Sequence, residues 1–226
     1  MLKTITPKKF LIFNLLFIAF LLVSNIAGII STYFYNHDYI FGLVPLFNFD
    51  TEMNIPTIYS ALALLFSGIL LFIIGDMNRQ ASHSYISWFA LSFIFVFLAI
   101  DEIAVIHENL IIPVRETLGT SGLLFYAWVI PYSIGLLLFL IIFSKFLLTL
   151  PRQSLLYFVV SGTIFVTGAI GFELIGGQHA EIHGRDNIAY AFITTCEELL
   201  EMLGIALFIY SLFNHLNQFS PLKDLD

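Results

Sequence analysis

Six long apolar stretches restrict the fold of this chain more than any other feature. They run over residues 10–30, 55–75, 85–107, 123–148, 155–176 and 188–213. A helix of about 20 apolar residues crosses the ~30 Å hydrocarbon layer of a bilayer, and a helix satisfies its own backbone hydrogen bonds, as lipid requires. The sequence therefore predicts an all-α integral membrane protein, in which residues 1–226 form one bundle of about six transmembrane helices.

The composition agrees with a membrane protein and argues against other classes. Hydrophobic residues make up 59% of the chain and charged residues 11%, whereas a soluble domain carries roughly 25% charged residues. The net charge of −7 argues against nucleic acid as a partner. Cys196 is the single cysteine, so an intramolecular disulfide is excluded, and its apolar neighbours indicate a small buried residue. The partner that the composition predicts is the lipid bilayer.

The residues between the apolar stretches supply signals for helix ends. Asn54 is a predicted N-cap of the second helix, and Pro56 would lie in its first turn. Pro151 is expected to end the fourth helix. Pro131 falls inside the fourth stretch, so we expect a kink there. Three glycines in the segment GGQHAEIHGRDN predict a loop between the fifth and sixth helices.

The basic residues predict how the bundle is oriented. If the N-terminus is cytoplasmic, seven of the nine Lys and Arg residues fall in cytoplasmic segments, and only Arg115 and Arg185 fall outside. An excess of Lys and Arg marks the cytoplasmic side, so both termini are expected there. The cytoplasmic set is Lys3, Lys8, Lys9, Arg79, Lys145, Arg152 and Lys223. The aromatic residues expected near the outer interface are Tyr33, Tyr35, Tyr126, Trp128 and Tyr132.

An unusual group of polar residues falls on the outer side in that orientation. The stretch FLAIDEIAVIHENL, residues 97–110, places three acids and a histidine at the end of an apolar helix. The fifth helix adds Glu173 near its outer end, and the sixth contains the segment CEELLEMLG. The resulting set is Asp101, Glu102, His107, Glu108, Glu173, Glu197, Glu198 and Glu201.

Helical spacing predicts that these side chains face one another. Asp101 and Glu108 are seven residues apart and would share one face of a continuous helix. In the sixth helix one stripe contains Tyr190, Thr194, Glu197, Glu201 and Gly204. On the fifth helix, Gly162, Ala169 and Gly176 lie on the side of Glu173, and small residues allow close helix approach. We therefore expect the acids of the third and sixth helices to lie close together.

Energetics require partners for these acids. A carboxylate at the membrane centre costs about 2.5–3.5 kcal/mol on the translocon scale, whereas a Leu or Phe returns only about 0.3–0.6 kcal/mol. No Lys or Arg lies in the outer half of any predicted span. The carboxyl groups are therefore either partly protonated, because crowding raises their pKa values, or neutralised by a bound metal cation.

A metal site is the second of these two interpretations. The expected ligands are Asp101, Glu102, His107, Glu108, Glu173, Glu197 and Glu201. The expected neighbours or alternative ligands are Glu52, His179, His183, Tyr190, Thr194 and Glu198. Carboxylate-rich ligation favours Fe, Mn or Zn. His179 and His183 have the spacing of a helical chelating pair, but the surrounding glycines favour a loop, and neither an H-E-x-x-H motif nor the Glu-x-x-His pattern of di-iron bundles is present.

Four segments carry a resemblance to a known group of proteins. They are NIPTIYSALALL, FLAIDEIAVIHE, GAIGFE and TCEELLEMLGIALFIYSL. With them the chain resembles a family of uncharacterised bacterial multi-pass membrane proteins over residues 50–212. The resemblance implies a location in the bacterial inner membrane and supports the acidic residues named above as site residues. It implies no activity.

Three functions remain open from the sequence. The first is a membrane metalloprotein, either an oxidoreductase or a hydrolase, that acts on a lipid or lipophilic substrate. The second is a transporter that uses the acids as a proton or cation relay. Asn14 is the main polar residue of the inner half, which favours a one-sided pocket over a path through the membrane. The third is a non-catalytic assembly subunit, from which the acids can be removed without loss of function.

Overall fold

The computed structural model describes residues 6–219, which are mostly helical and contain no strand. Six helical segments are long and apolar enough to cross a membrane. Five of them are α1 (Pro7–Tyr35), α3 (Ile55–Gln80), α4 (Ile86–Ala104), α7 (Val129–Thr149) and α10 (Ile188–Phe219). The sixth joins α8 (Arg152–Val166), the π-helical turn η3 (Thr167–Phe172) and α9 (Glu173–His183).

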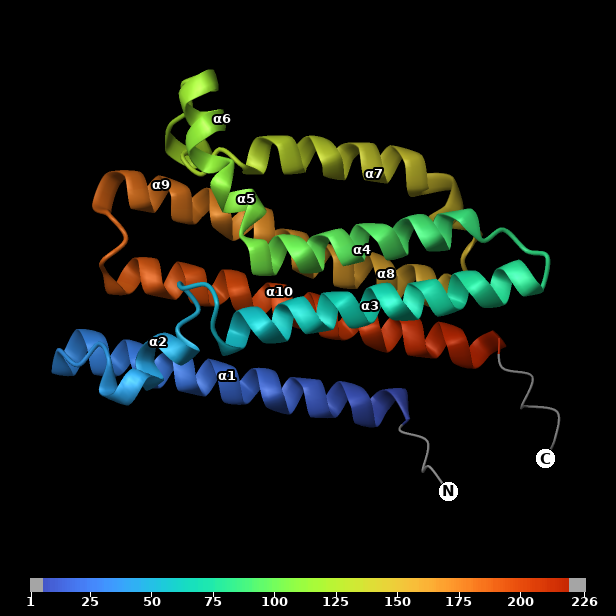
Figure 1. Cartoon of the computed structure of the whole chain (residues 1–226), viewed down its shortest axis with the longest axis horizontal. Helices are drawn as coiled ribbons and strands as arrows, with labels where there is room; N and C mark the ends of the chain where they lie inside the picture. The colour runs from blue at the N-terminus through green and yellow to red at the C-terminus, as the bar shows by residue number, and fades with distance from the viewer. Residues whose placement is uncertain (1–5, 220–226) are drawn as a thin grey trace.

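The long helices lie side by side along the molecule, and α10 runs through the middle of the bundle (Figure 1). It packs against α1, α3, α8, η3 and α9. α1 begins and α10 ends at the same end of the bundle (Figure 1). The short elements lie at or near the opposite end; they are η1 (Ile40–Gly42), α2 (Leu43–Phe47), α5 (Ile106–Asn109), α6 (Ile111–Leu118) and η2 (Gly122–Leu124).

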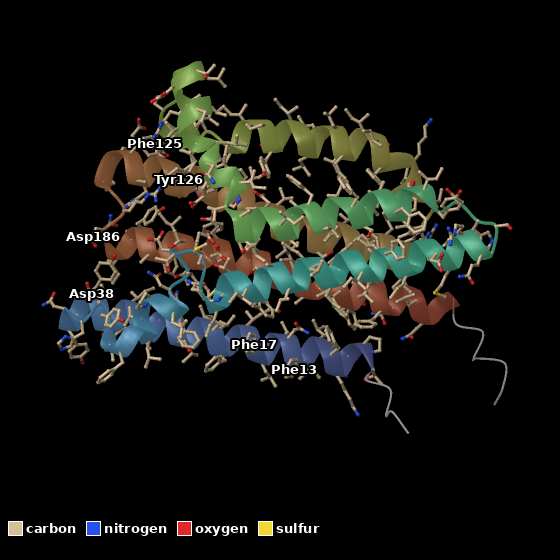
Figure 2. The ribbon with its side chains drawn as sticks, in the orientation of Figure 1. Phe13, Phe17, Asp38, Phe125, Tyr126 and Asp186 are labelled. Atoms are coloured by element: carbon tan, nitrogen blue, oxygen red, sulfur yellow. The ribbon has the colours of Figure 1, made fainter. Side chains whose placement is uncertain are left out.

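The surface of the bundle is apolar in the way that a lipid environment requires. Large side chains project outward, among them Phe13 with 67% of its surface exposed and Phe93 with 74%; Figure 2 shows Phe13 on the outer side of α1. An exposed apolar surface of this extent is unfavourable in water. The buried core instead contains Leu71, Ile209 and Leu212 between α3 and α10.

Several helix ends confirm the signals in the sequence. The Asn54 side chain accepts a hydrogen bond from the Thr57 backbone N at 3.1 Å, and Pro56 lies in the first turn of α3. Helix α7 ends at Thr149, just before Pro151. Lys3 and Lys223, which contributed to the predicted orientation, lie outside the described residues.

Three predicted features of the helices were wrong. The fourth span begins at Val129 rather than at residue 123, so Pro131 lies in the first turn of α7, where a missing N–H causes no interior kink. The segment around His179 is helical and not a loop, because α9 continues to His183 and Gly184 ends it with a φ of 74°. The third span ends at Ala104 rather than at residue 107.

Close helix contacts depend on glycines that the sequence analysis identified only in part. A Cβ atom at Gly168 would lie 2.6 Å from the backbone oxygen of Glu197, and one at Gly204 would lie 2.7 Å from the backbone N of Phe165. These two glycines therefore allow the α8–η3 segment to approach α10. A Cβ atom at Gly162 would have no neighbouring atom within 4 Å, so the role predicted for Gly162 at the helix interface was wrong.

Candidate functional site

The break at the end of α4 is organised by the carboxylate of Asp101. Val105 adopts a left-handed conformation with a φ of 54° and separates α4 from α5. Asp101 Oδ1 accepts a hydrogen bond from the His107 backbone N at 2.9 Å and lies 3.3 Å from His107 Nδ1. Asp101 Oδ2 accepts one from the Tyr132 hydroxyl at 2.9 Å. Both oxygens of this buried side chain therefore have partners.

This break contradicts the helical face predicted for Asp101 and Glu108. The seven-residue spacing applies only to a continuous helix, whereas Val105 interrupts the helix between the two residues. Asp101 points into the protein, and Glu108 is exposed. Asp101 therefore contacts the residues that follow the break and does not form a joint carboxylate face with Glu108.

His107 is held between Asp101 and two aromatic rings. The centroid of its imidazole lies 4.8 Å from that of Trp128 and 6.3 Å from that of Tyr132. Burial lowers the pKa of His107, but the hydrogen bond and the charge of Asp101 outweigh that effect, and the charges of Glu102 and Glu201 act in the same direction. The result is a pKa of about 9. At neutral pH, without a bound cation, His107 is therefore the positive member of an ion pair.

Glutamates from α4 and α10 face one another beside this pair. Glu102 interacts electrostatically with both Glu198 and Glu201. Glu201 also interacts with His107 and Glu173. All of these glutamates are only partly buried. The structure thus brings the acids of the third and sixth spans together, as predicted, although Glu102 and not Asp101 makes the contact.

A second pair of acids extends the cluster toward α9. The carboxyl groups of Glu173 and Glu197 lie within hydrogen-bonding reach of each other. Glu173 also accepts a hydrogen bond from Trp128 Nε1. The turn η3 directly precedes Glu173 and is π-helical, a distortion that frequently occurs at functional sites. Gly168 in this turn allows the backbone that carries Glu173 to approach the turn of α10 that carries Glu197.

A loop before α3 adds Glu52 to the same cluster. Burial and the charge of Glu108 raise the pKa of Glu52, and a hydrogen bond from the Thr57 hydroxyl at 3.2 Å opposes this shift. Glu52 interacts with Glu102, Glu198 and Glu201. We call the joint group the acidic cluster, and it consists of Glu52, Glu102, Glu173, Glu197, Glu198 and Glu201.

The loop that carries Glu52 is fastened by Asn25, which the sequence analysis missed. Asn25 donates a hydrogen bond to the Thr195 hydroxyl at 2.8 Å and accepts one from the Phe49 backbone N at 3.1 Å. Its side chain thereby joins α1, α10 and the loop. A lone Asn in the apolar run of α1 was the available signal, since a buried amide requires partners.

Charge compensation within the acidic cluster comes from His107. Among residues 6–219, ion pairs within 4.0 Å join Arg79 to Asp76 and His107 to Asp101, and no Lys or Arg pairs with a cluster glutamate. Arg185 interacts electrostatically with Asp50, which is not part of the cluster. The negative charge expected from the sequence is thus concentrated in the structure without an arginine or lysine partner.

Several predicted neighbours have other roles in the structure. The Tyr190 hydroxyl is hydrogen-bonded to that of Tyr126 at 2.8 Å, and Thr194 bonds the backbone of its own helix. His179 Nε2 lies 2.9 Å from Asn187 Oδ1, and its ring centroid lies 4.9 Å from that of His183. These contacts place the two histidines as a pair along α9.

The half of the bundle where α1 begins and α10 ends contains more buried polar contacts than the sequence indicated. Besides Asn14, whose Oδ1 accepts a hydrogen bond from the Tyr59 hydroxyl at 3.0 Å, it contains a buried contact of 3.0 Å between Ser154 Oγ and His215 Nδ1. The only signal for the second contact was that Ser154 lies near the start, and His215 near the end, of an apolar helix.

The described residues do not hold a ready-made metal site. No three His, Cys, Asp or Glu side chains in the part of the chain that the structure describes are arranged around a common point as ligands. The glutamates of the acidic cluster have three rotatable bonds each, so a different set of rotamers would be needed to converge on one cation.

Comparison with known proteins identifies one family. The model of a family described as Domain of unknown function (DUF8692) matches residues 11–216. No curated protein and no solved structure gives a significant match. The matched region includes every residue of the acidic cluster, together with Asp101 and His107.

Proposed function

The chain belongs to the DUF8692 family, whose description assigns no activity, and we propose from its own side chains that it is a membrane metalloprotein. The observation that carries this proposal is the meeting of Glu102, Glu198 and Glu201 without a Lys or Arg partner. Like charges in a region of low dielectric repel one another strongly. A divalent cation between α4 and α10 would remove that repulsion and join the two helices.

The Asp101–His107 pair supports a metal in particular. Histidines that bind metals usually donate their other ring N–H to a carboxylate, which fixes the orientation of the ring. Asp101 lies 3.3 Å from His107 Nδ1 and is hydrogen-bonded on both oxygens. We therefore propose that Asp101 orients the His107 ring. The proposed metal ligands are His107, Glu102, Glu198 and Glu201.

The ligand types define the metal and its chemistry. Three carboxylates and one imidazole favour Fe, Mn or Zn over copper(I). Such a metal would supply either Lewis-acid activation of water or redox chemistry. Glu173 and Glu197 would then serve as neighbouring acids that hold or accept a proton. Because the site lies inside an apolar bundle, we propose a lipid or lipophilic molecule as the substrate of an oxidoreductase or hydrolase.

We place the protein in the bacterial inner membrane with both termini in the cytoplasm. Five basic residues in the described part of the chain support this orientation, namely Lys8, Lys9, Arg79, Lys145 and Arg152, since all lie near the ends of helices at the side where α1 begins. Arg115 and Arg185 belong to the opposite side. The acidic cluster would then open toward the periplasm.

Thermal unfolding in the presence and absence of metal tests this proposal. A ligand that binds only the folded state stabilises it, by about 2.7 kcal/mol at a concentration of 100 times its Kd. We expect Fe, Mn or Zn to raise the Tm of the chelator-treated protein and Glu201→Gln to reduce that increase. Glu116→Gln is the matched control, because Glu116 is exposed on α6. An equal increase in both variants would refute the assigned ligands.

The buried polar contacts of the inner half favour a second candidate function, a proton or cation relay. Ser154, His215 and Asn14 place hydrogen-bonding groups on the cytoplasmic side of the acidic cluster. Intramembrane ionisable residues commonly mark such pathways. Flux of protons or cations into vesicles that contain the purified protein, abolished by both Glu201→Gln and His215→Phe, would favour the relay over the metalloenzyme.

A further inference from the structure

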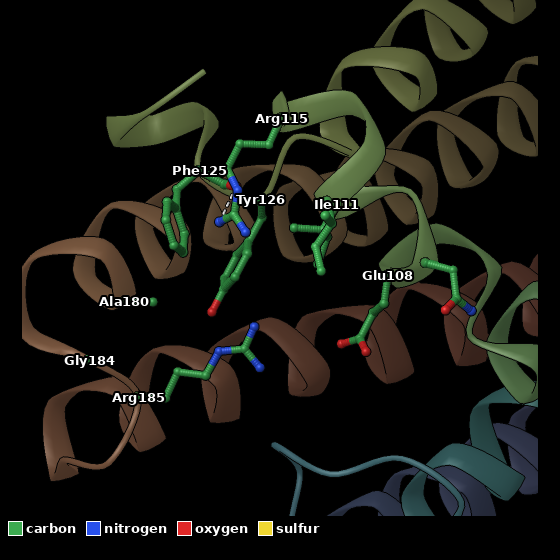
Figure 3. Close-up of a pocket in the computed structure, with 10 residues that line it drawn as sticks. Glu108, Ile111, Arg115, Phe125, Tyr126, Ala180, Gly184 and Arg185 are labelled. Carbon is green, nitrogen blue, oxygen red and sulfur yellow. Dashed lines mark hydrogen bonds between the residues drawn. The ribbon is translucent and has the colours of Figure 1, made fainter. Parts of the chain in front are cut away.

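A cavity beside the acidic cluster contains both arginines of the outer side. Its volume is about 420 Å³, within the range of about 300–1,000 Å³ that is typical of ligand sites. Its walls come from α5, α6, the turn after η2, the end of α9, and Gly184 and Arg185 after α9. Figure 3 shows Arg115 and Arg185 on either side of Tyr126, with Glu108 at one edge of the cavity.

The guanidinium groups of Arg115 and Arg185 each lie over an aromatic ring and form no close ion pair among the described residues. Arg115 lies 4.2 Å from the centroid of the Phe125 ring, and Arg185 lies 4.9 Å from that of Tyr126. Arg115 Nη1 also donates a long hydrogen bond, 3.4 Å, to the Phe125 backbone O. Within residues 6–219 neither arginine has a carboxylate within 4.0 Å. Since each guanidinium has five N–H donors, most of them remain available to a ligand.

Part of the remaining wall is apolar, next to the polar side chains of Glu108 and Asn109. Ile111, Ile112 and Ala180 line it, and Ile112 has 58% of its surface exposed. Arg185 is itself exposed, so the cavity is open to the outside of the bundle. Two arginines in a fork geometry suit the oxygens of a phosphate, and the apolar walls suit the start of a hydrocarbon chain.

We propose that this cavity binds the phosphate group of an amphiphile through Arg115 and Arg185, with its apolar part along Ile111 and Ile112. The proposal that this cavity is a binding site depends only on the cavity itself and not on a bound metal. As the substrate site of the enzyme it rests on the proposed function, because Glu108 joins the cavity wall to the acidic cluster, where it interacts with Glu52 and Glu173. Glu108 also directly follows His107, one of the assigned metal ligands, in the chain.

Binding to the full chain, purified in a neutral detergent with chelator present, tests this inference independently of any metal. Native mass spectrometry would compare phosphatidylglycerol, diacylglycerol and inorganic phosphate as ligands. We expect phosphatidylglycerol to bind and diacylglycerol, which lacks the phosphate, to bind at least tenfold more weakly. Competition by inorganic phosphate alone at equal concentration would assign the site to free phosphate instead of a lipid, with the same two arginines as its ligands.

The variants separate this site from general charge effects. Arg115→Gln and Arg185→Gln should each weaken binding about tenfold, since a charge-assisted hydrogen bond contributes about 1.4 kcal/mol or more. Arg152→Gln, which removes a charge at the other end of the bundle, should leave binding unchanged. Ala180→Leu fills the cavity but keeps both arginines, and it should also weaken binding. This variant provides the test if an arginine variant does not fold. Equal binding of phosphatidylglycerol and diacylglycerol, or unchanged binding in Ala180→Leu and in the folded arginine variants, would overturn the inference.

Discussion

At the scale of single residues, Asp101 determines the geometry of the chain break beside the site. Only 4% of its surface is exposed, and its carboxylate accepts hydrogen bonds from the His107 backbone, which follows the break, and from Tyr132 on α7. If this carboxylate is removed, each of its polar partners becomes a buried group without a hydrogen bond, which costs free energy of folding. Asp101 is therefore the residue on which the position of His107 depends.

Asp101→Asn is expected to destabilise the protein more than Tyr132→Phe. The first change removes the charge that pairs with His107 and should cost about 1–3 kcal/mol or more, whereas the second removes one hydrogen bond, worth about 1 kcal/mol. Unfolding by heat or by SDS would measure both. Equal losses would show that the contact between Asp101 and His107 contributes nothing.

The acids at this scale were predictable, but their individual contacts were not. Glu102, Glu198 and Glu201 were recognisable in the sequence because charged residues inside an apolar helix require an interior position. The reversal of the roles of Asp101 and Glu102 was not, because it depends on the left-handed Val105, a conformation that is unfavourable for a β-branched residue and has no signal in the sequence.

At the scale of elements, the site depends on two close approaches between segments far apart in the chain. The first is between η3 and α10 at Gly168. The second joins the loop before α3 to α1 and α10 through Asn25. Each brings an acid of the cluster to its place, Glu173 in the first case and Glu52 in the second.

Gly168→Ala is expected to destabilise the bundle and to displace Glu173 from Glu197. The added Cβ would lie 2.6 Å from a backbone oxygen of α10, which cannot move aside like a flexible side chain. Overpacking of this kind costs about 1–3 kcal/mol. Gly162→Ala is the matched control on α8, where no atom lies within 4 Å, and it should be neutral or stabilise the helix by up to about 1 kcal/mol. A smaller loss for Gly168→Ala than for Gly162→Ala would contradict the close approach.

Asn25→Ala is expected to release the loop that carries Glu52. The change leaves the Thr195 hydroxyl and the Phe49 N–H without their partner, at about 1–3 kcal/mol for each buried group. Hydrogen exchange should increase in residues 48–54. Ser24→Ala, an exposed change on the same helix, should leave exchange there unaltered. Unchanged protection in the Asn25 variant would show that the loop is held by other contacts.

Helix existence was predictable at this scale, whereas helix continuity was not. Asn54 and Pro151 identified ends correctly because caps and prolines act locally. The glycines near His179 predict a loop, yet α9 continues through Gly176 and Gly177, since packing against Tyr126 compensates for their low helix propensity. Tertiary contacts of this kind cannot be read from local sequence.

At the scale of the whole molecule, one end of the bundle is acidic and polar while the long apolar helices form the rest. Asp38 and Asp186 lie at that end, as Figure 2 shows. The six apolar segments were predictable because length and hydropathy alone define them. The loops, short helices and the cavity at the acidic end depend on long-range packing and were not.

Single cysteines at Asp38 and Asp186 are expected to react with a membrane-impermeant reagent added to intact cells. Both residues are exposed at the acidic end, which the proposed orientation places outside. The experiment uses a Cys196→Ser background, and a cysteine at Arg79 serves as the inner control, which should react only after the membrane is opened. The reverse pattern would place the acidic cluster on the cytoplasmic side.

The central claim is that the acidic cluster holds a metal ion, and the metal content of the purified protein tests it most directly. Elemental analysis would compare wild type, Glu198→Gln with Glu201→Gln together, and the control Glu116→Gln, all purified without chelator. We predict a stoichiometric amount of Fe, Mn or Zn in wild type and in the control, and its loss from the double variant. Wild type that contains no such metal and takes up none when it is supplied, or a double variant that retains a full complement, would contradict the account.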